Sequence, residues 1–133
     1  MTESTEILIA DRNPRIRRFL KRELTAAGYH VRLVDNGKEL LQLVYSRLKI
    51  DLLILDPDFP CRDAIDLSRK INARIPPLPV VLHSVRSAEE LQDFRGGNIV
   101  HIEKNGNSVE LLKETIHTIL AEYGHANPLV PQA

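Results

Sequence analysis

Short aliphatic runs alternate with longer amphipathic segments along the chain, and one of these runs lies between two aspartates. Residues 52–55 are Leu-Leu-Ile-Leu, with Asp51 before them, Asp56 after them, and a turn containing Pro57 and Pro60 next. An apolar run of this length is typical of a strand that is buried on both faces of a parallel sheet. The same pattern predicts four more strands, at residues 7–10, 29–34, 79–83 and 98–103. The weak alternation in the second of them indicates an edge strand.

Between the strands, apolar residues recur at steps of three and four, which is typical of helices with one buried face. Pro14 suits the first position of a helix, and Gly28 suits the cap at its carboxyl end. We expect the second helix over residues 38–48. The third is expected to start at Asp63 as its N-cap and to stop before the prolines at 76 and 77.

Two more helical segments complete the pattern. The segment at residues 87–94 is short and is ended by the glycines at 96 and 97, whereas residues 109–123 have a full apolar face. Across the four longer helices, the side chains expected to face inward are Ile16, Phe19, Leu20, Leu24, Ala27, Leu40, Leu41, Val44, Leu48, Ala64, Leu67, Ile71, Ile75, Val109, Leu112, Ile116, Ile119, Leu120 and Tyr123.

The alternation of strands and helices predicts the fold class. Parallel strands joined by right-handed crossovers form a three-layer α/β sandwich, and 133 residues suit one domain with a full core. We expect residues 1–6 to be a disordered N-terminus and residues 7–123 to be the domain. Residues 124–133, which contain prolines and small residues, are expected to be a flexible tail or the start of a linker.

The composition narrows the possible partners and compartments. Lys plus Arg and Asp plus Glu are 18 each, so the net charge is zero, and nothing favours binding to nucleic acid or to a membrane surface. No apolar run approaches the roughly 20 residues that span a bilayer. The single cysteine, Cys61, allows no internal disulfide, and the polar N-terminus is unlike a signal peptide. These features predict a cytoplasmic protein.

Chemically active side chains follow four of the predicted strands. In order, the strand ends carry Asp11 with Arg12, then Asp56, Ser84 and Lys104, and open α/β sheets bind ligands at this edge. A carboxylate can take a phosphoryl group as a mixed anhydride, and neighbouring acids can hold Mg²⁺. A lysine pairs with phosphate oxygens, and a hydroxyl can bond a newly arrived phosphate. The set therefore predicts a phosphoryl-transfer site.

Together, these pieces resemble the receiver domain of two-component response regulators, from residue 7 to about 122. The matching pieces are residues 7–11 with Pro14, residues 51–56 with Pro60, residues 79–84, and Lys104. Each piece alone is a weak signal, but the four in this order and spacing are specific. The resemblance implies a flavodoxin-like parallel sheet in the order 2-1-3-4-5 with five helices.

The resemblance also implies a role for each site residue. Asp56 would be the phospho-acceptor, Asp11 a Mg²⁺-binding acid, Ser84 the switch hydroxyl and Lys104 the lysine that pairs with the phosphoryl group. The backbone carbonyl of Asp58 would be a third Mg²⁺ ligand, and its side chain could also serve as one.

Several positions depart from the family's pattern. Arg12 stands where a second acid is usual, His101 at the position of the switch aromatic, Asn105 in place of a proline and Cys61 in place of a glycine. The segment between the fourth and fifth strands is also short, so the fourth helix is expected to be degenerate. We expect Arg12 to reach toward Asp56 or Asp58 and to weaken Mg²⁺ binding. A solvated Arg12 remains an alternative.

Three functions are open. The first is a receiver that takes a phosphoryl group from a sensor histidine kinase or a phosphotransfer protein. It would signal through the face formed by the fourth strand, the fifth strand and the last helix, and a homodimer is one form that it could take. The second is a degenerate receiver that binds partners without phosphorylation. The third is a phosphatase, because Asp56 and Asp58 resemble the Asp-x-Asp pair of haloacid-dehalogenase-type enzymes. Those enzymes place the pair after their first strand, which argues against this third function.

Further alternatives concern single residues. Asp11 could cap the first helix instead of binding a metal ion. His83 and His101 are interpreted as packed strand residues with satisfied rings rather than as switches.

Overall fold

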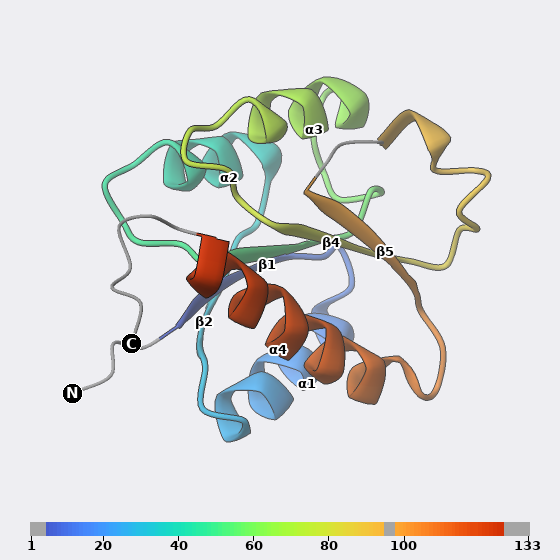
Figure 1. Cartoon of the computed structure of the whole chain (residues 1–133). Coiled ribbons are helices and arrows are strands. Elements are labelled where there is room, and N and C mark those ends of the chain that lie inside the picture. Colours follow the sequence, from blue (N-terminus) through green and yellow to red (C-terminus); the bar gives the residue numbers. More distant parts are fainter. Residues whose placement is uncertain (1–4, 95–97, 127–133) are drawn as a thin grey trace.

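In a computed structural model of the chain, five parallel strands form one sheet with helices on both faces (Figure 1). The structure describes residues 5–94 and 98–126, with side chains as far as residue 122. The strands are β1 (Glu6–Ala10), β2 (His30–Leu33), β3 (Leu52–Leu55), β4 (Val80–Ser84) and β5 (Ile99–Glu103). The helices are α1 (Pro14–Ala26), α2 (Gly37–Val44), α3 (Ala64–Asn72), α4 (Ser108–Ala126) and the 3₁₀ helix η1 (Gln92–Phe94).

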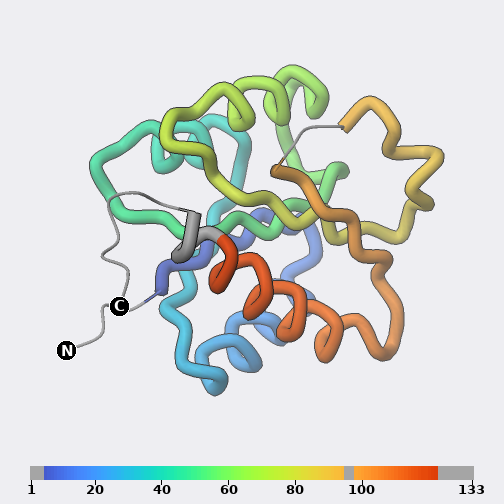
Figure 2. Tube along the Cα trace, viewed as in Figure 1, coloured from blue at the N-terminus to red at the C-terminus, as the bar shows by residue number. Residues whose placement is uncertain are grey.

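The strand order is β2-β1-β3-β4-β5, and every neighbouring pair is parallel, as predicted. α2 and α3 cover one face, and α1 and α4 cover the other (Figures 1 and 2). Alternate residues of each central strand serve the two layers: Leu8 and Leu53 join the core under α2 and α3, whereas Ile9 and Ile54 join the core under α1 and α4. The sandwich therefore has two cores that share one sheet.

The ends of the helices follow from local chemistry. α1 begins at Pro14, and the side chain of Asn13 caps it by accepting the backbone N–H groups of Arg15 and Ile16. Asp63 caps α3, as predicted. Gly28 follows α1 with a φ of +100°, a conformation that suits glycine.

Four of the inward-facing predictions are wrong, and Tyr123 lies outside the residues whose side chains the structure describes. Leu48 is 47% exposed because α2 ends at Val44, where the hydroxyl of Ser46 donates to the carbonyl of Leu43 and competes with the helical backbone. Ile75 is 92% exposed because α3 stops at Asn72, since a residue before proline disfavours the helical conformation.

Phe19 is the third exception, with 41% of its surface exposed. Its ring lies against the guanidinium of Arg22, which is 5.6 Å from the ring centroid. Ala27 is also exposed, at the C-cap of α1. The outward side of α1 therefore carries an aromatic ring among cations.

The fourth helical segment is degenerate, as predicted. It consists of turns and the 3₁₀ helix η1, anchored by the buried side chains of Leu91 and Phe94. The glycines at 96 and 97, expected to end it, lie outside the described residues. At the domain's ends, β1 already begins at Glu6, and α4 continues to Ala126, beyond the expected start of the tail at residue 124.

Gly37 lies at the start of α2, where the helix packs closely against the turn after β3. A Cβ atom at this position would lie 2.7 Å from the Cβ of Cys61. We expect Gly37→Ala to lower the free energy of unfolding by roughly 1–3 kcal/mol, because overpacking outweighs the roughly 1 kcal/mol by which alanine favours a helix. Urea unfolding measures the change.

The matched control is Gly106→Ala, because a Cβ there meets nothing within 4 Å. Adding Cys61→Gly to Gly37→Ala should restore part of the loss, since the contact is with the Cβ of Cys61. Equal stability of the two single alanine variants would contradict the proposed contact.

Candidate functional site

Four of the predicted site residues meet at the carboxyl edge of the sheet. Asp11 follows β1, Asp56 follows β3, Ser84 ends β4 and Lys104 follows β5. The ammonium of Lys104 lies 2.9 Å from Oδ2 of Asp11 and 3.4 Å from Oδ2 of Asp56. The parallel register brings about this convergence, because neighbouring strands end at the same level.

Both carboxylates are buried, and Lys104 is their shared counter-charge. Asp11 and Asp56 are 1% and 2% exposed, and a buried charge is tolerated only with such a partner. The contact from Lys104 to Asp11 is an ion pair without hydrogen-bond geometry, so Oδ2 of Asp11 has no hydrogen-bond partner. The contact to Asp56 is a hydrogen bond as well as an ion pair.

The two oxygens of Asp56 have different surroundings. Oδ1 accepts the backbone N–H of Asp58 at 2.9 Å and so closes the turn after β3. Oδ2 faces Lys104 and Arg12. Oδ2 is therefore the oxygen of Asp56 that lies beside two positive charges.

Arg12 extends over the site from the segment between β1 and α1. Its Nε lies 3.6 Å from Oδ2 of Asp56, and its NH2 nitrogen lies 3.8 Å from Oδ2 of Asp58. The side chain is 54% exposed. The guanidinium thus faces both carboxylates, as expected, while keeping part of its surface in solvent.

Asp11 supports this segment but does not cap the helix. Its Oδ1 accepts the backbone N–H of Asn13 at 2.8 Å, and Asn13 itself is the N-cap of α1. Asp11 therefore stabilises a local turn instead of capping the helix, and its Oδ2 faces the site.

Arg86 belongs to the same cluster and was missed by the sequence analysis. Its guanidinium pairs with Oδ1 of Asp58, and its backbone N–H donates to the hydroxyl of Ser84 at 3.0 Å. A signal was available: Arg86 lies two residues after the end of β4, above the edge where the other site residues gather.

The carboxylate oxygens do not fit a bound Mg²⁺ in this arrangement. Each already faces a nitrogen: Asp11 meets Asn13 and Lys104, Asp56 meets Asp58, Lys104 and Arg12, and Asp58 meets Arg86 and Arg12. Mg²⁺ requires free oxygen ligands in near-octahedral geometry. Among residues 5–94 and 98–126, no group of three His, Cys, Asp or Glu side chains is arranged to hold a metal ion.

The histidines of β4 and β5 are only partly satisfied, which corrects their interpretation as fully paired rings. Nε2 of His83 lies 3.1 Å from the hydroxyl of Ser108, while its Nδ1 is buried without a partner. Burial, and secondarily the charge of Lys104, lowers the pKa of His83 to about 4. His101 is half-buried, and its Nε2 has no hydrogen-bond partner.

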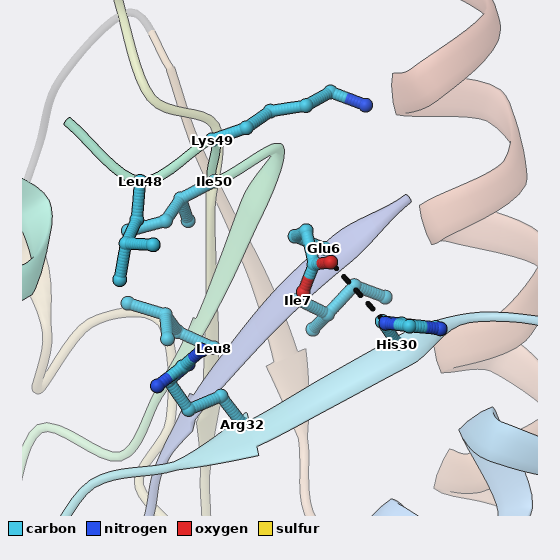
Figure 3. A pocket seen from close by; sticks show the side chains of 8 residues that line it. All are labelled: Glu6, Ile7, Leu8, His30, Arg32, Leu48, Lys49 and Ile50. Atoms are coloured by element: carbon cyan, nitrogen blue, oxygen red, sulfur yellow. Dashed lines mark ion pairs between the residues drawn. The ribbon is translucent and has the colours of Figure 1, made fainter. Parts of the chain in front are cut away.

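A cavity of about 280 Å³ lies elsewhere, at the amino ends of β1 and β2. Figure 3 shows its lining, including the ion pair between His30 and Glu6, which measures 3.3 Å. Because Glu6 starts β1 and Asp11 follows it, the cavity is at the opposite edge of the sheet from the acidic cluster. None of the predicted site residues lines it.

The sequence pattern of the response regulator receiver domain matches residues 7–116, which is most of the chain. The chain therefore belongs to the receiver domain family of two-component signalling. Receiver domains are signalling modules that bind Mg²⁺ and act with histidine kinases. Within residues 5–94 and 98–126, no helix is long and apolar enough to cross a membrane.

Relatives contain a similar segment within longer proteins. The chain is 39% identical over 80 residues to the sensor protein EvgS of Escherichia coli K12, covering 60% of this chain and 7% of EvgS. It is 31% identical over 85 residues to the response regulator MprA of Mycobacterium ulcerans, covering 64% of this chain and 36% of MprA. The chain thus spans well under half the length of these relatives.

Solved structures share the fold. A response regulator receiver protein from Sinorhizobium medicae has a TM-score of 0.77 and 25% identity, with 90% of this chain and 96% of that chain covered. The response regulator TrrA from Thermotoga maritima, in complex with Mg²⁺ and BeF, has a TM-score of 0.74 and 27% identity, with 86% and 98% covered.

His83 should make stability depend on pH. Its pKa is about 4 in the folded protein and about 6.5 when unfolded, so the unfolded state binds the extra proton between these values. Stability is therefore complete above pH 6.5 and falls as the pH falls toward 4. We expect a loss of roughly 2 kcal/mol at pH 5 relative to pH 7 from this group.

Urea unfolding at pH 7 and pH 5 tests this dependence. The loss should be smaller by about that amount in His83→Gln and unchanged in His117→Gln, which alters an exposed histidine of α4. The same pH dependence in wild type and His83→Gln would contradict the assignment.

Proposed function

We propose that this receiver domain accepts a phosphoryl group on Oδ2 of Asp56. The observation that carries the proposal is the position of the Lys104 ammonium between Asp56 and Asp11. An ammonium there can neutralise charge on the phosphoryl oxygens during transfer. The donor would be a phosphohistidine of a sensor kinase or phosphotransfer protein.

The transfer forms one bond and breaks another. An electron pair of Oδ2 of Asp56 forms the new O–P bond, while the P–N bond of the donor breaks. The donor's imidazole nitrogen keeps that electron pair and takes up a proton. Asp56 becomes an acyl phosphate, and its negative charge increases.

We propose that Ser84 detects this change. Its side chain is fully buried at the end of β4, and its oxygen accepts the N–H of Arg86. The hydroxyl proton can then donate to the new phosphoryl group. We propose that the signal passes to the face formed by β4, β5 and α4, where Val100 and Leu111 are exposed and could contact a target or a second copy of the chain.

A degenerate receiver is the second candidate, and a specific observation supports it. We propose that Arg12 occupies the place of a second acid, and with Arg86 it leaves every oxygen of Asp56 and Asp58 paired. A pocket whose carboxylates are all paired in this way could keep the domain in a single conformation. Partners would then bind without phosphorylation.

Phosphorylation separates the two candidates. Incubation with acetyl phosphate and Mg²⁺, followed by intact-mass measurement, should add one phosphoryl group to the wild type and none to Asp56→Asn. The control is Asp35→Asn, which removes an exposed carboxylate that pairs with Arg17 and should keep the adduct. A folded wild type that gains no phosphoryl group would favour the degenerate receiver.

Replacing Arg12 tests its effect on Mg²⁺. One pair of unit charges about 4 Å apart interacts by roughly 4 kcal/mol at an effective dielectric of about 20. Solvent at the half-exposed Arg12 reduces this value. We expect Arg12→Asp to bind Mg²⁺ at least about tenfold more tightly than the wild type, as measured by NMR titration of the amide of Asp58.

Arg15→Asp is the matched control, because it makes the same charge change on an exposed residue of the first turn of α1. Its Mg²⁺ affinity should stay close to that of the wild type. Equal affinity of Arg12→Asp and wild type would rule out the proposed role of Arg12.

A further inference from the structure

We propose that Arg12 and Arg86 together take over the charge of a divalent cation, so that the pocket holds a phosphoryl group on Asp56 without a metal ion. This inference rests on the proposed function of Asp56. It differs from the degenerate receiver because it assigns the two guanidinium groups a ligand.

The charged side chains of the cluster sum to a net charge of zero. Asp11, Asp56 and Asp58 contribute three negative charges, and Lys104 contributes one positive charge, which leaves two negative charges. Arg12 and Arg86 each add one positive charge and bring the total to zero. Two guanidinium groups therefore supply the same charge as one Mg²⁺ ion.

The geometry places Arg12 beside the reactive oxygen of Asp56, and it places Arg86 on the neighbouring carboxylate of Asp58. Arg12 comes from the segment after β1, Arg86 comes from the segment after β4, and they pair with different oxygens of Asp58. The backbone N–H of Asp58 in turn donates to Asp56. Asp58 thus holds two guanidinium groups at the mouth of the pocket, next to the carboxylate that would be phosphorylated.

The resting partners of the guanidinium groups are replaceable. Both arginine side chains are roughly half exposed, so they can turn without leaving the edge of the sheet. A phosphoryl group offers three strong acceptor oxygens and more negative charge than the carboxylate of Asp58. Arg12, Arg86 and Lys104 are three cations for those three oxygens, and guanidinium groups suit phosphate geometry because they donate as a planar fork.

The exchange would also move the segment after β4. The backbone N–H of Arg86 is bonded to the hydroxyl of Ser84, so Arg86 and Ser84 act on the same turn. When Arg86 leaves Asp58 for the phosphoryl group, this turn is drawn toward Asp56. The switch residue and the charge that neutralises the phosphoryl group are therefore coupled.

Beryllium fluoride tests the inference, because its trifluoride adduct on a carboxylate imitates a phosphoryl group. ¹⁹F NMR would detect the adduct on the full chain in chelator-treated buffer and again with Mg²⁺. We expect the wild type to form the adduct in both buffers. In Arg12→Gln/Arg86→Gln, the adduct without Mg²⁺ should fall at least tenfold and should be restored by Mg²⁺, which can then reach the freed carboxylates.

Three further variants test whether the effect belongs to Arg12, Arg86 and Asp56. Arg15→Gln/Arg69→Gln removes two exposed arginines from α1 and α3 and should behave as wild type. The single variant Arg86→Gln should lose part of the metal-free adduct, which keeps the test informative if the double variant is unstable. Asp56→Asn should form no adduct in either buffer.

The outcomes separate the inference from the function on which it rests. An adduct that requires Mg²⁺ in the wild type overturns the inference but leaves Asp56 as the acceptor. A metal-free adduct that persists in Arg12→Gln/Arg86→Gln also overturns it, because the arginines would not be responsible. No adduct on the wild type in either buffer overturns both the inference and the proposed function.

Discussion

The structure depends on a buried cluster in which two carboxylates share one ammonium group. Asp11 and Asp56 are almost fully inaccessible to solvent, and Lys104 lies within ion-pair distance of both. Truncating one member of such a cluster leaves an uncompensated buried charge, which typically costs about 3–5 kcal/mol. The three residues come from the ends of three strands, so this pairing also requires the whole register of β1, β3 and β5. The site therefore forms only when the strands of the sheet are in register.

Hydrophobic patterning predicted the sheet well because both faces of its central strands are buried. The runs that became β1, β3 and β4 are almost uniformly apolar, and only a parallel sheet between two helix layers buries such runs completely. Once the strands are placed, the meeting of Asp11, Asp56, Ser84 and Lys104 follows from geometry. That part of the site was predictable from sequence alone.

The helix ends and one charged partner were not predictable in the same way. Leu48 and Ile75 continue the apolar period of their helices, but a serine hydroxyl and a following proline end those helices first. Arg86 lies in a loop, where neither hydrophobic period nor strand position indicates which way a long side chain turns. Its contact with Asp58 joins two loops that follow different strands, so it depends on how both loops fold.

The reduced segment between β4 and β5 has a consequence for how a signal could leave the site. Backbone hydrogen bonds in this segment span three residues, with the N–H groups of Leu91, Gln92 and Phe94 donating to the carbonyls of Ala88, Glu89 and Leu91. A full helix in this place would move as a rigid body, because its hydrogen-bond ladder opens cooperatively. A single 3₁₀ turn lacks that ladder, so the largely exposed residues 85–90 can rearrange at low free-energy cost while Leu91 and Phe94 stay anchored in the core. A signal would then pass through local unfolding of this loop and not through the movement of a rigid helix.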